Sequence, residues 1–332
     1  MKEFACPRCE EAVFFNQCEC VYCGNMLAFD ATDLKITCLN RNLACANRGI
    51  IGCNWKVEDG RRLCRSCSLT RTIPYLGVER NVLLWRRVEE AKRWLIYDLC
   101  RLPLPLAPQS GPGVAFDILS DDACPIMTGH MGGLITLSLA EADDVEREAR
   151  RVTFREPYRT LLGHFRHEVG HFYWQALVAE TKMNGPFKVV FDDPGQDYAA
   201  ALTSYYNRTN RAYDRKGFIS EYATSHPWED WAETFAHFLH IVSTLDSVAE
   251  LPLPIDPRFR QTLEDPYREN DFEVLLASWM RIARSINKLN RSLGLNDAYP
   301  FELSQIVTGK LHFVHMSVHH FRNVEQKRQR RP

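Results

Sequence analysis

The chain has 332 residues, 45% of them hydrophobic and 25% charged, and its 41 basic and 42 acidic side chains give a net charge of −1. This length and composition predict one large core plus a small accessory domain. No apolar run approaches the length of a transmembrane helix. The first residues, Met-Lys-Glu-Phe-Ala-Cys-Pro, lack the apolar core of a signal peptide, so we expect a cytoplasmic protein.

Cysteine spacing indicates two metal sites in the first 75 residues. Twelve cysteines in a cytoplasmic chain suggest metal ligands rather than disulfides. The first four form two Cys-x-x-Cys pairs separated by ten residues, the arrangement of zinc-ribbon knuckles, in which each pair closes a tight turn and offers two thiolates. These residues are Cys6, Cys9, Cys20 and Cys23. The second predicted site consists of Cys45, Cys53, Cys64 and Cys67, with Cys38 as an alternative to Cys45.

The charge of this N-terminal region argues against a nucleic-acid partner. Residues 1–110 contain 16 Lys and Arg and 12 Asp and Glu, a net charge of +4 before metal binding. Each zinc ion held by four thiolates adds about −2, so two sites bring the region to about zero. DNA or RNA requires a basic surface instead. We expect the metals to fold this region, and its partner to be a peptide or protein rather than nucleic acid or a membrane.

The chain after the cysteines predicts a connecting helix, a linker and a larger domain. Apolar residues recur at helical spacing over residues 81–100, and a proline-rich stretch that cannot be helical follows. Residues 114–119 and 133–139 have the pattern of strands. The predicted divisions are a tandem zinc-ribbon region at 1–75, a connecting helix and linker at 76–112, the main domain at 113–325 and a basic tail at 326–332.

The most informative motif is His167-Glu168-Val169-Gly170-His171. On a helix, the i, i+4 spacing points both imidazoles at one metal ion, and the adjacent glutamate faces the metal-bound water. Pro157 suits the first turn of such a helix, and residues 158–178 contain no further proline. The apolar residues around the motif predict a buried helix, where unbonded histidines would be costly. The alternative is a pair of core histidines with ordinary hydrogen bonds.

A second predicted helix supplies carboxylates, which matter because a catalytic zinc site usually has three protein ligands and an open fourth position. Ser225 or His226 can cap this helix, and Pro227 fits its first turn. Glu229 and Glu233 lie one turn apart on one face, among tryptophans that predict burial. One of the two should bind the metal and the other support it, and the spacing does not decide which. The alternative is a solvated acidic face.

Two further helices are predicted over residues 272–291 and 301–321. The second contains four histidines with no carboxylate nearby in the sequence, so we expect no metal site there. The whole pattern predicts an α+β fold: a predominantly helical zincin-like metallopeptidase domain with a small mixed sheet, preceded by a small zinc-ribbon domain.

The second half of the predicted site resembles that of lethal-factor-like and Mlc-titration-factor-like zincins, through Tyr222 and the Glu-x-x-Ala-Glu core that joins Glu229 to Glu233. The residues that this resemblance implies as ligands of a catalytic zinc ion are His167, His171 and Glu229. It also implies Glu168 as general base, Tyr222 as donor to the substrate oxyanion and Glu233 as support for a ligand. His226, beside the capping turn, is an alternative oxyanion donor.

Nearly the whole chain also resembles a bacterial family of zinc-binding metallopeptidases that carry an N-terminal zinc ribbon. The matching stretches are Cys-Asn-Trp at 53–55, Cys-Arg-Ser-Cys at 64–67, Tyr-Arg-Thr-Leu-Leu-Gly-His-Phe-Arg-His-Glu at 158–168, His-Pro-Trp-Glu-Asp-Trp-Ala-Glu at 226–233 and Asn-Arg-Ser-Leu-Gly-Leu at 290–295. The chain departs from the family at Asp-Asp-Pro, 192–194, and at the extra thiols Cys18 and Cys38. The resemblance implies fold and metal more firmly than substrate.

The expected activity is hydrolysis of a peptide bond by a zinc-activated water, with Glu168 taking the proton and Tyr222 stabilising the oxyanion. The expected cofactors are one catalytic and two structural zinc ions, about three per chain. Two other interpretations stay open: a regulatory protein-binding module built on a non-catalytic zincin core, and a DNA-associated protease of the SprT type. The intact Glu168 favours catalysis, because metal binding alone does not require it.

Overall fold

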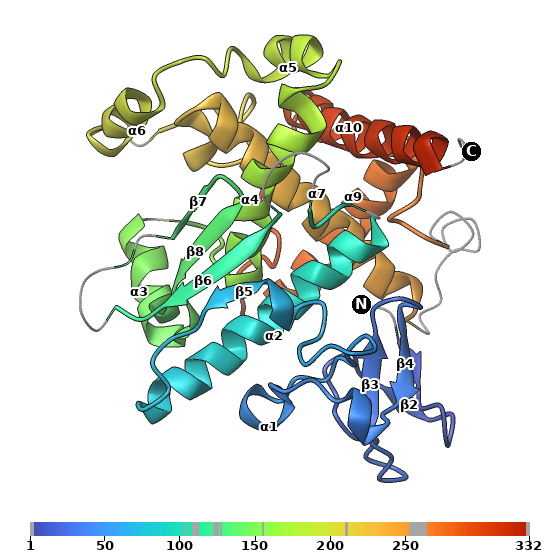
Figure 1. Ribbon diagram of the computed structural model, residues 1–332. Coiled ribbons are helices and arrows are strands. Elements are labelled where there is room, and N and C mark those ends of the chain that lie inside the picture. The colour runs from blue at the N-terminus through green and yellow to red at the C-terminus, as the bar shows by residue number, and fades with distance from the viewer. Residues whose placement is uncertain are drawn as a thin grey trace. The chain divides into compact units, whose positions relative to one another are not determined.

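The computed structural model describes residues 3–102, 104–107, 113–121, 126, 128–154, 156–209, 212–251 and 264–329, with side chains described as far as residue 324. The chain divides into two compact units, Met1–Phe165 and Arg166–Pro332. Within the described residues, the strands all belong to the first unit, and helices build the second (Figure 1). The fold is therefore α+β, as the sequence predicts.

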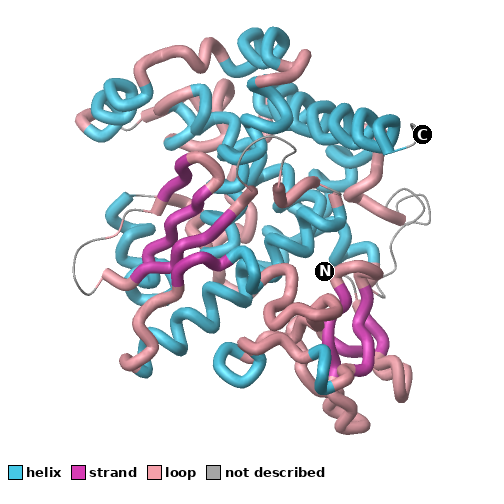
Figure 2. The backbone as a smooth tube through the Cα atoms, viewed as in Figure 1, coloured by secondary structure: helices cyan, strands magenta, loops and turns pink. Residues whose placement is uncertain are grey.

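The N-terminal part of the first unit contains two short antiparallel hairpins and little helix (Figure 2). Strand β1 (Phe4–Ala5) pairs with β2 (Ala12–Val13), and β3 (Leu27–Asp30) pairs with β4 (Lys35–Cys38). A short helix, α1 (Arg48–Ile51), follows them. Elements this short bury little apolar surface, and small domains of this kind depend on bound metals for stability.

Aromatic side chains join these hairpins to the connecting helix, α2 (Glu79–Arg101). The ring of Phe15 lies 3.9 Å, centroid to centroid, from that of Trp94 on α2. Arg48 links the two cysteine-rich halves, because its guanidinium donates a hydrogen bond of 2.6 Å to the carbonyl of Cys18. The ribbon region and α2 thus share one core.

The first unit also contains a four-stranded mixed sheet in the order β5-β6-β8-β7. Its strands are β5 (Thr70–Thr72), β6 (Ala115–Leu119), β7 (Gly129–Met131) and β8 (Leu134–Ser138). β5, β6 and β8 are parallel, whereas β7 runs antiparallel to β8. Phe116, Asp117 and Ile118 are all buried, as expected for an inner strand covered on both faces. The predicted strands at 114–119 and 133–139 are correct to within one residue at each end.

Helix α7 lies at the centre of the second unit, in contact with α5, α9 and α10 (Figure 1). The helices of the structure beyond the sheet are α3 (Asp144–Phe154), α4 (Leu161–Trp174), α5 (Asn184–Phe191), α6 (Tyr198–Tyr206), α7 (Pro227–Ala249), α9 (Phe272–Ser292) and α10 (Gln305–Gln329). Short 3₁₀ turns span Arg41–Leu43, Cys67–Leu69, Leu139–Ala142 and Tyr222–Thr224. Trp231 of α7 packs against Phe187 of α5 and Phe313 of α10, which buries the middle of this helix.

Two helices begin later than the sequence predicts. Helix α4, which contains His167 and His171, begins at Leu161 rather than at residue 157. The Thr160 hydroxyl caps it there, because it accepts a hydrogen bond from a backbone amide of the first turn. Helix α10 likewise begins after the predicted start at residue 301, with the Ser304 hydroxyl accepting from a backbone amide of its first turn. Beyond α4 the chain forms a π-helical turn, Gln175–Ala179, instead of continuing as α-helix.

Candidate metal centre and active site

Helix α4 presents His167 and His171 on one face, as their spacing predicts. Their ring centroids are 5.0 Å apart. Val169 is fully buried and Phe172 almost so, which fixes the orientation of the helix in its core. Glu168 is buried as well. The motif therefore sits where an unbonded polar side chain would cost free energy.

Helix α7 presents two carboxylates to α4. The helix begins at Pro227, and His226 is its N-cap: Nδ1 of His226 accepts a hydrogen bond of 3.1 Å from the backbone amide of Trp228. Of the two possible capping residues, the structure thus uses His226. Glu229 and Glu233 follow one turn apart, and Glu229 is 1% exposed.

The three predicted ligands of the catalytic metal converge. One ligand atom of each of His167, His171 and Glu229 lies within 4.8 Å of the other two. Glu229 Oε2 is 3.0 Å from His167 Nε2 and 3.3 Å from His171 Nε2. Two imidazoles and a carboxylate are a common ligand set of catalytic zinc, and such a set leaves a fourth position for water. The side chains present therefore fit a zinc ion.

Glu233 lies behind His167 rather than among the converging atoms. His167 Nδ1 donates a hydrogen bond of 2.6 Å to Glu233 Oε1. With the proton on Nδ1, the lone pair of the neutral ring is on Nε2, the atom that faces Glu229. The geometry thus distinguishes the two glutamates. Glu229 lies beside both imidazoles, whereas Glu233 orients the imidazole of His167. The spacing in the sequence left this choice open.

The carboxylates and imidazoles of the cluster pair as opposite charges. Burial would lower the pKa of His167, but the carboxylates of Glu229 and Glu233 hold it well above its ordinary value. Burial would likewise raise the pKa of Glu229, but the imidazoles of His171 and His167 hold it well below its usual range. Buried charges need a partner of opposite sign. Without a metal, protonated imidazoles supply the positive charge that these carboxylates need. A divalent metal would supply that charge in their place.

Three further polar side chains surround the cluster. Burial raises the pKa of Glu168, which suits a group that must take up a proton near neutral pH. Tyr222 lies beside His167, with ring centroids 5.8 Å apart, and burial raises the pKa of its phenol, which therefore stays a donor. His226 uses both ring nitrogens elsewhere: one caps α7, and the other donates to the carbonyl of Gln196 at 3.3 Å. Of the two predicted oxyanion donors, Tyr222 is the one whose ring lies beside His167.

One functional side chain was missed by the sequence analysis. The hydroxyl of Tyr198 donates a hydrogen bond of 2.6 Å to Glu229 Oε1. Tyr198 is the first residue of α6, 31 positions before Glu229, and no periodicity relates residues on different helices at such a separation. The only signal in the sequence is that its short helix contains three tyrosines.

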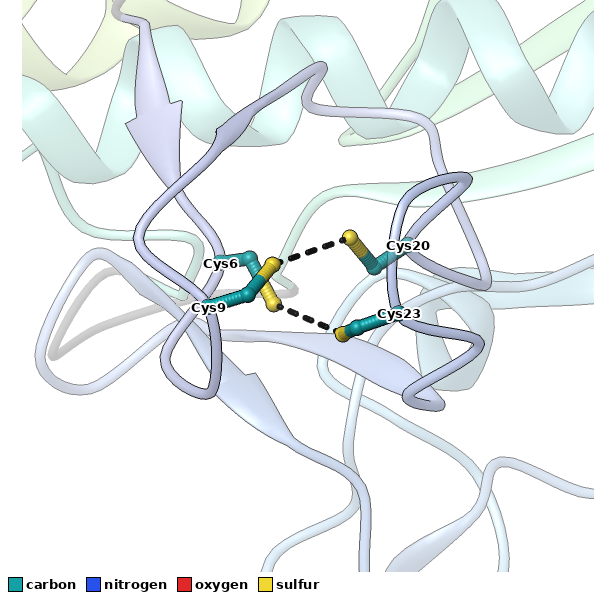
Figure 3. Close-up of side chains that lie close together, drawn as sticks. All are labelled: Cys6, Cys9, Cys20 and Cys23. Atoms are coloured by element: carbon teal, nitrogen blue, oxygen red, sulfur yellow. Dashed lines mark hydrogen bonds between the residues drawn. The ribbon is translucent and has the colours of Figure 1, made fainter.

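The first cysteine cluster assembles as predicted from its two knuckles (Figure 3). Cys6 Sγ lies 3.7 Å from Cys23 Sγ, and Cys9 Sγ lies 3.7 Å from Cys20 Sγ. Four sulfurs bound tetrahedrally at about 2.3 Å from a zinc ion are about 3.8 Å apart, whereas the sulfurs of a disulfide are about 2 Å apart. The observed spacing fits a zinc ion.

The second cluster contains Cys45, Cys53, Cys64 and Cys67, all buried. Cys53 Sγ is 3.6 Å from Cys64 Sγ and 3.7 Å from Cys67 Sγ, again the spacing of zinc ligands. Cys38, the alternative to Cys45, is exposed, and its sulfur accepts a hydrogen bond of 3.2 Å from the side-chain amide of Asn25. The structure therefore places Cys45, not Cys38, in the second group.

Two four-cysteine clusters that precede, in the sequence, a mainly helical region with a His-His-Glu group are the features of a zinc-binding metallopeptidase with a zinc ribbon. Comparison with known families agrees. The model of the family described as "Putative zinc-binding metallo-peptidase" matches residues 81–317, and that of a zinc-ribbon domain family matches residues 3–78. The chain belongs to this metallopeptidase family.

Relatives occur in mycobacteria. An uncharacterized protein of Mycobacterium tuberculosis (strain H37Rv) and one of Mycobacterium bovis are each 39% identical over 328 residues, which cover 96% of this chain and 95% of the relative. No solved structure matches the chain. In the part of the chain that the structure describes, we find no helix with the length and apolar character needed to cross a membrane.

Proposed function

We propose that this protein is a cytoplasmic zinc-dependent peptidase, with His167, His171 and Glu229 as ligands of the catalytic zinc. The observation that supports this most directly is the convergence of these ligand atoms within 4.8 Å. Glu168, buried and adjacent to a ligand, supports catalysis over mere metal storage, because a structural site has no use for a further buried carboxylate. Membership in a metallopeptidase family agrees with the proposal.

The chain's own residues then have distinct roles. A zinc ion held by His167, His171 and Glu229 would supply Lewis acidity and would lower the pKa of a nearby water. Glu168, whose pKa is raised by burial, would accept a proton from the attacking water and pass it to the leaving amine. Tyr222 donates to the oxyanion that develops on the scissile carbonyl. Glu233 holds His167 in the tautomer that offers Nε2 as a ligand.

The test is a proteome-wide cleavage comparison of the wild type with Glu168→Gln. The substitution keeps the shape of the side chain and removes the base, so we expect full zinc content and a loss of turnover of roughly 100- to 10,000-fold. Glu180→Gln, at an exposed glutamate just beyond the π-helical turn, is the matched control and should cleave like the wild type. Undiminished cleavage by Glu168→Gln would contradict the assigned role.

The same comparison separates the other two interpretations. If neither wild type nor variant cleaves any protein, a non-catalytic binding module built on the zincin core is favoured. If wild-type cleavage appears only when DNA is added, a protease of the SprT type is favoured. We expect cleavage that is independent of DNA, because two occupied zinc sites leave the N-terminal region without a net positive charge.

We further propose that the first ribbon docks a basic segment of a protein partner or substrate. The tip of its second knuckle exposes Val21 by 75% and Tyr22 by 66%. Glu10, Glu11 and Glu19 are exposed in the same ribbon, and residues 3–24 contain four glutamates but one arginine. A zinc ion held by four thiolates would add a charge of about −2, so this surface is acidic. Exposed apolar side chains in an acidic surface suit a basic segment with an apolar anchor.

This docking is tested with the double substitution Val21→Ser and Tyr22→Ser. We expect a lower kcat/KM for a protein substrate and an unchanged value for a short peptide that contains the same cleavage site. Val145→Ser, at a valine 76% exposed on α3, is the control for lost surface apolarity. An equal loss for protein and short peptide would contradict docking.

A further inference from the structure

The beginning of α6 is held against the first turn of α7 by two hydrogen bonds. His226 Nε2 donates to the carbonyl of Gln196 at 3.3 Å, and the Tyr198 hydroxyl donates to Glu229 Oε1 at 2.6 Å. Asp197 begins the helix, because its carboxylate accepts a hydrogen bond of 3.0 Å from an amide of the first turn. The orientation of Tyr198 is therefore set both by its own helix cap and by the cap of the helix that carries Glu229.

Packing also restrains the Tyr198 ring. Its centroid lies 5.2 Å from that of His226 and 5.7 Å from that of Trp228. A tyrosine hydroxyl is protonated at neutral pH, so Tyr198 is the donor in its hydrogen bond to the Glu229 carboxylate. A restrained donor of this kind fixes the orientation of the group that accepts from it.

The two oxygens of Glu229 consequently face different partners. Oε2 faces the imidazoles, 3.0 Å from His167 Nε2 and 3.3 Å from His171 Nε2. Oε1 accepts the hydrogen bond from Tyr198. Carboxylates bind metals through one oxygen or through both. A hydrogen bond to one oxygen favours binding through the other.

We propose that Tyr198 is a positioning residue that keeps Glu229 a one-oxygen ligand of the catalytic metal. This inference rests on the proposed zinc site, although not on peptidase activity. If Oε1 also bound the metal, it would occupy the coordination position that a water needs. Tyr198 thereby preserves an open position without touching the metal or the substrate.

The test compares Tyr198→Phe with Tyr206→Phe, the same substitution at a half-exposed tyrosine at the other end of α6. Zinc affinity of the His-His-Glu site is measured by competition with a chelator that leaves the cysteine clusters loaded. We expect Tyr198→Phe to weaken zinc binding about tenfold, the lower end of the usual effect of removing a group that orients a metal ligand. Tyr206→Phe should bind zinc like the wild type.

Cobalt provides a readout that a merely structural role would not change. With Co²⁺ in the His-His-Glu site and zinc in the cysteine clusters, visible absorption reports the coordination number. We expect weaker absorption for Tyr198→Phe, because a second carboxylate oxygen enters the coordination sphere, and a wild-type spectrum for Tyr206→Phe. Unchanged zinc affinity together with an unchanged Co²⁺ spectrum would overturn the proposal.

The unfolding midpoint of the metal-free proteins separates this effect from a folding defect. We expect the two variants to unfold at similar midpoints, so that the difference between them appears only with metal present. A weaker zinc affinity that merely follows a lower metal-free midpoint, with an unchanged Co²⁺ spectrum, would also overturn the proposal. None of these measurements requires proteolysis, so a protein that binds zinc but cleaves nothing would contradict the proposed function and leave this test intact.

Discussion

Gly170 of α4 lies against Ala232 of α7 so closely that a Cβ atom at Gly170 would come within 3.0 Å of Ala232 Cα and 3.2 Å of its carbonyl oxygen. The glycine within the His-Glu-Val-Gly-His motif therefore lets the two ligand-bearing helices pack backbone against backbone. Trp231 strengthens this contact, because its indole N–H donates to the Gly170 carbonyl at 2.8 Å. The distance between the helices in turn sets the distance between the histidines and Glu229.

Gly170→Ala should disturb both stability and metal binding. The added methyl group meets backbone atoms that cannot move without shifting a helix, so we expect a loss of roughly 1–3 kcal/mol in the free energy of unfolding and weaker zinc binding. Urea unfolding and chelator competition measure the two effects. Gly309→Ala on α10 is the control: its Cβ meets nothing within 4 Å, and it should gain about 0.5–1 kcal/mol. A Gly170→Ala protein with wild-type stability and zinc affinity would refute the close-packing argument.

Lys310 forms a buried ion pair with Asp230, the residue after Glu229 in the first turn of α7. Its Nζ lies 2.5 Å from Asp230 Oδ2 and donates to the carbonyl of Gly217 at 2.6 Å. Lys310→Met removes the donor to the buried Asp230 carboxyl group and to the Gly217 carbonyl, which we expect to cost roughly 1–3 kcal/mol in metal-free urea unfolding at neutral pH. Adding Asp230→Asn should recover much of this loss. Equal losses in the single and double variants would contradict the ion-pair argument.

The cost of Lys310→Met should also depend on pH. Burial raises the pKa of Asp230 to about 7 even beside Lys310, and removing the lysine raises it further. A carboxyl group with a pKa above its unfolded value favours the folded state less as pH rises, so the loss relative to the wild type should be larger at pH 8 than at pH 5. Urea unfolding of both proteins at these two pH values measures the difference.

Glu141 gives the first unit an acid-sensitive cluster. Its Oε1 accepts from Arg150 at 2.6 Å and Arg159 at 2.7 Å, and its Oε2 lies 3.3 Å from His164 Nδ1. Burial would raise the pKa of Glu141, but His164 and the two arginines lower it below its usual value. Its contribution to stability is therefore present at neutral pH and lost as the pH falls through the ordinary glutamate range and then through the lowered folded-state value.

Glu141→Gln measures that contribution. At pH 7 we expect a loss of roughly 2–3 kcal/mol, below the value for fully buried pairs because Arg150 is partly exposed. The difference from the wild type should shrink as the pH falls below about 4, where the wild-type carboxyl group also becomes neutral. A difference that stays constant from pH 7 to pH 3 would show that the charge of Glu141 is not what stabilises the unit.

Metal content tests the ribbon sites directly. We expect about three zinc ions per purified chain, and about two for Cys53→Ser, whose sulfur lies within 3.7 Å of two partners in the buried cluster. The loss should be accompanied by a lower unfolding temperature, since binding energy in such small domains is also folding energy. Cys38→Ser, at the exposed thiol, should keep all three ions. An unaltered zinc content in Cys53→Ser would contradict the second site.

The spacing of residues along short stretches of sequence was sufficient to predict several parts of the fold and of the candidate sites. The pair His167 and His171 and the Cys-x-x-Cys knuckles depend on contacts within one helical turn or one tight turn, which a short stretch of sequence determines. The strands at 114–119 and 133–139 follow in the same way from short-range patterning. The helix starts were less accurate, because a side-chain hydrogen bond from Thr160 or Ser304 decides the boundary and many neighbouring residues could have capped the helix instead.

The choice between Glu229 and Glu233 and the role of Tyr198 depended on contacts between elements. Glu229 and Glu233 lie one turn apart on the same face of α7, so the sequence does not show which of them reaches the histidines. The packing of α4 on α7 places Glu229 beside both imidazoles. Tyr222 and His226 differ because His226 is committed to a helix cap. No local pattern related Tyr198 to Glu229, since the two residues are 31 positions apart in the chain.

The sequence by itself therefore determined which side chains are available: residues of metal-binding type in three groups, and a glutamate directly after one of the histidines. Only the tertiary structure decided which oxygen of Glu229 faces the histidines, which residue holds its other oxygen, and why a glycine separates the ligand pair. The physical reason is that ligand type is a property of side chains, whereas ligand geometry depends on how closely α4, α6 and α7 approach each other, as at Gly170 and Ala232.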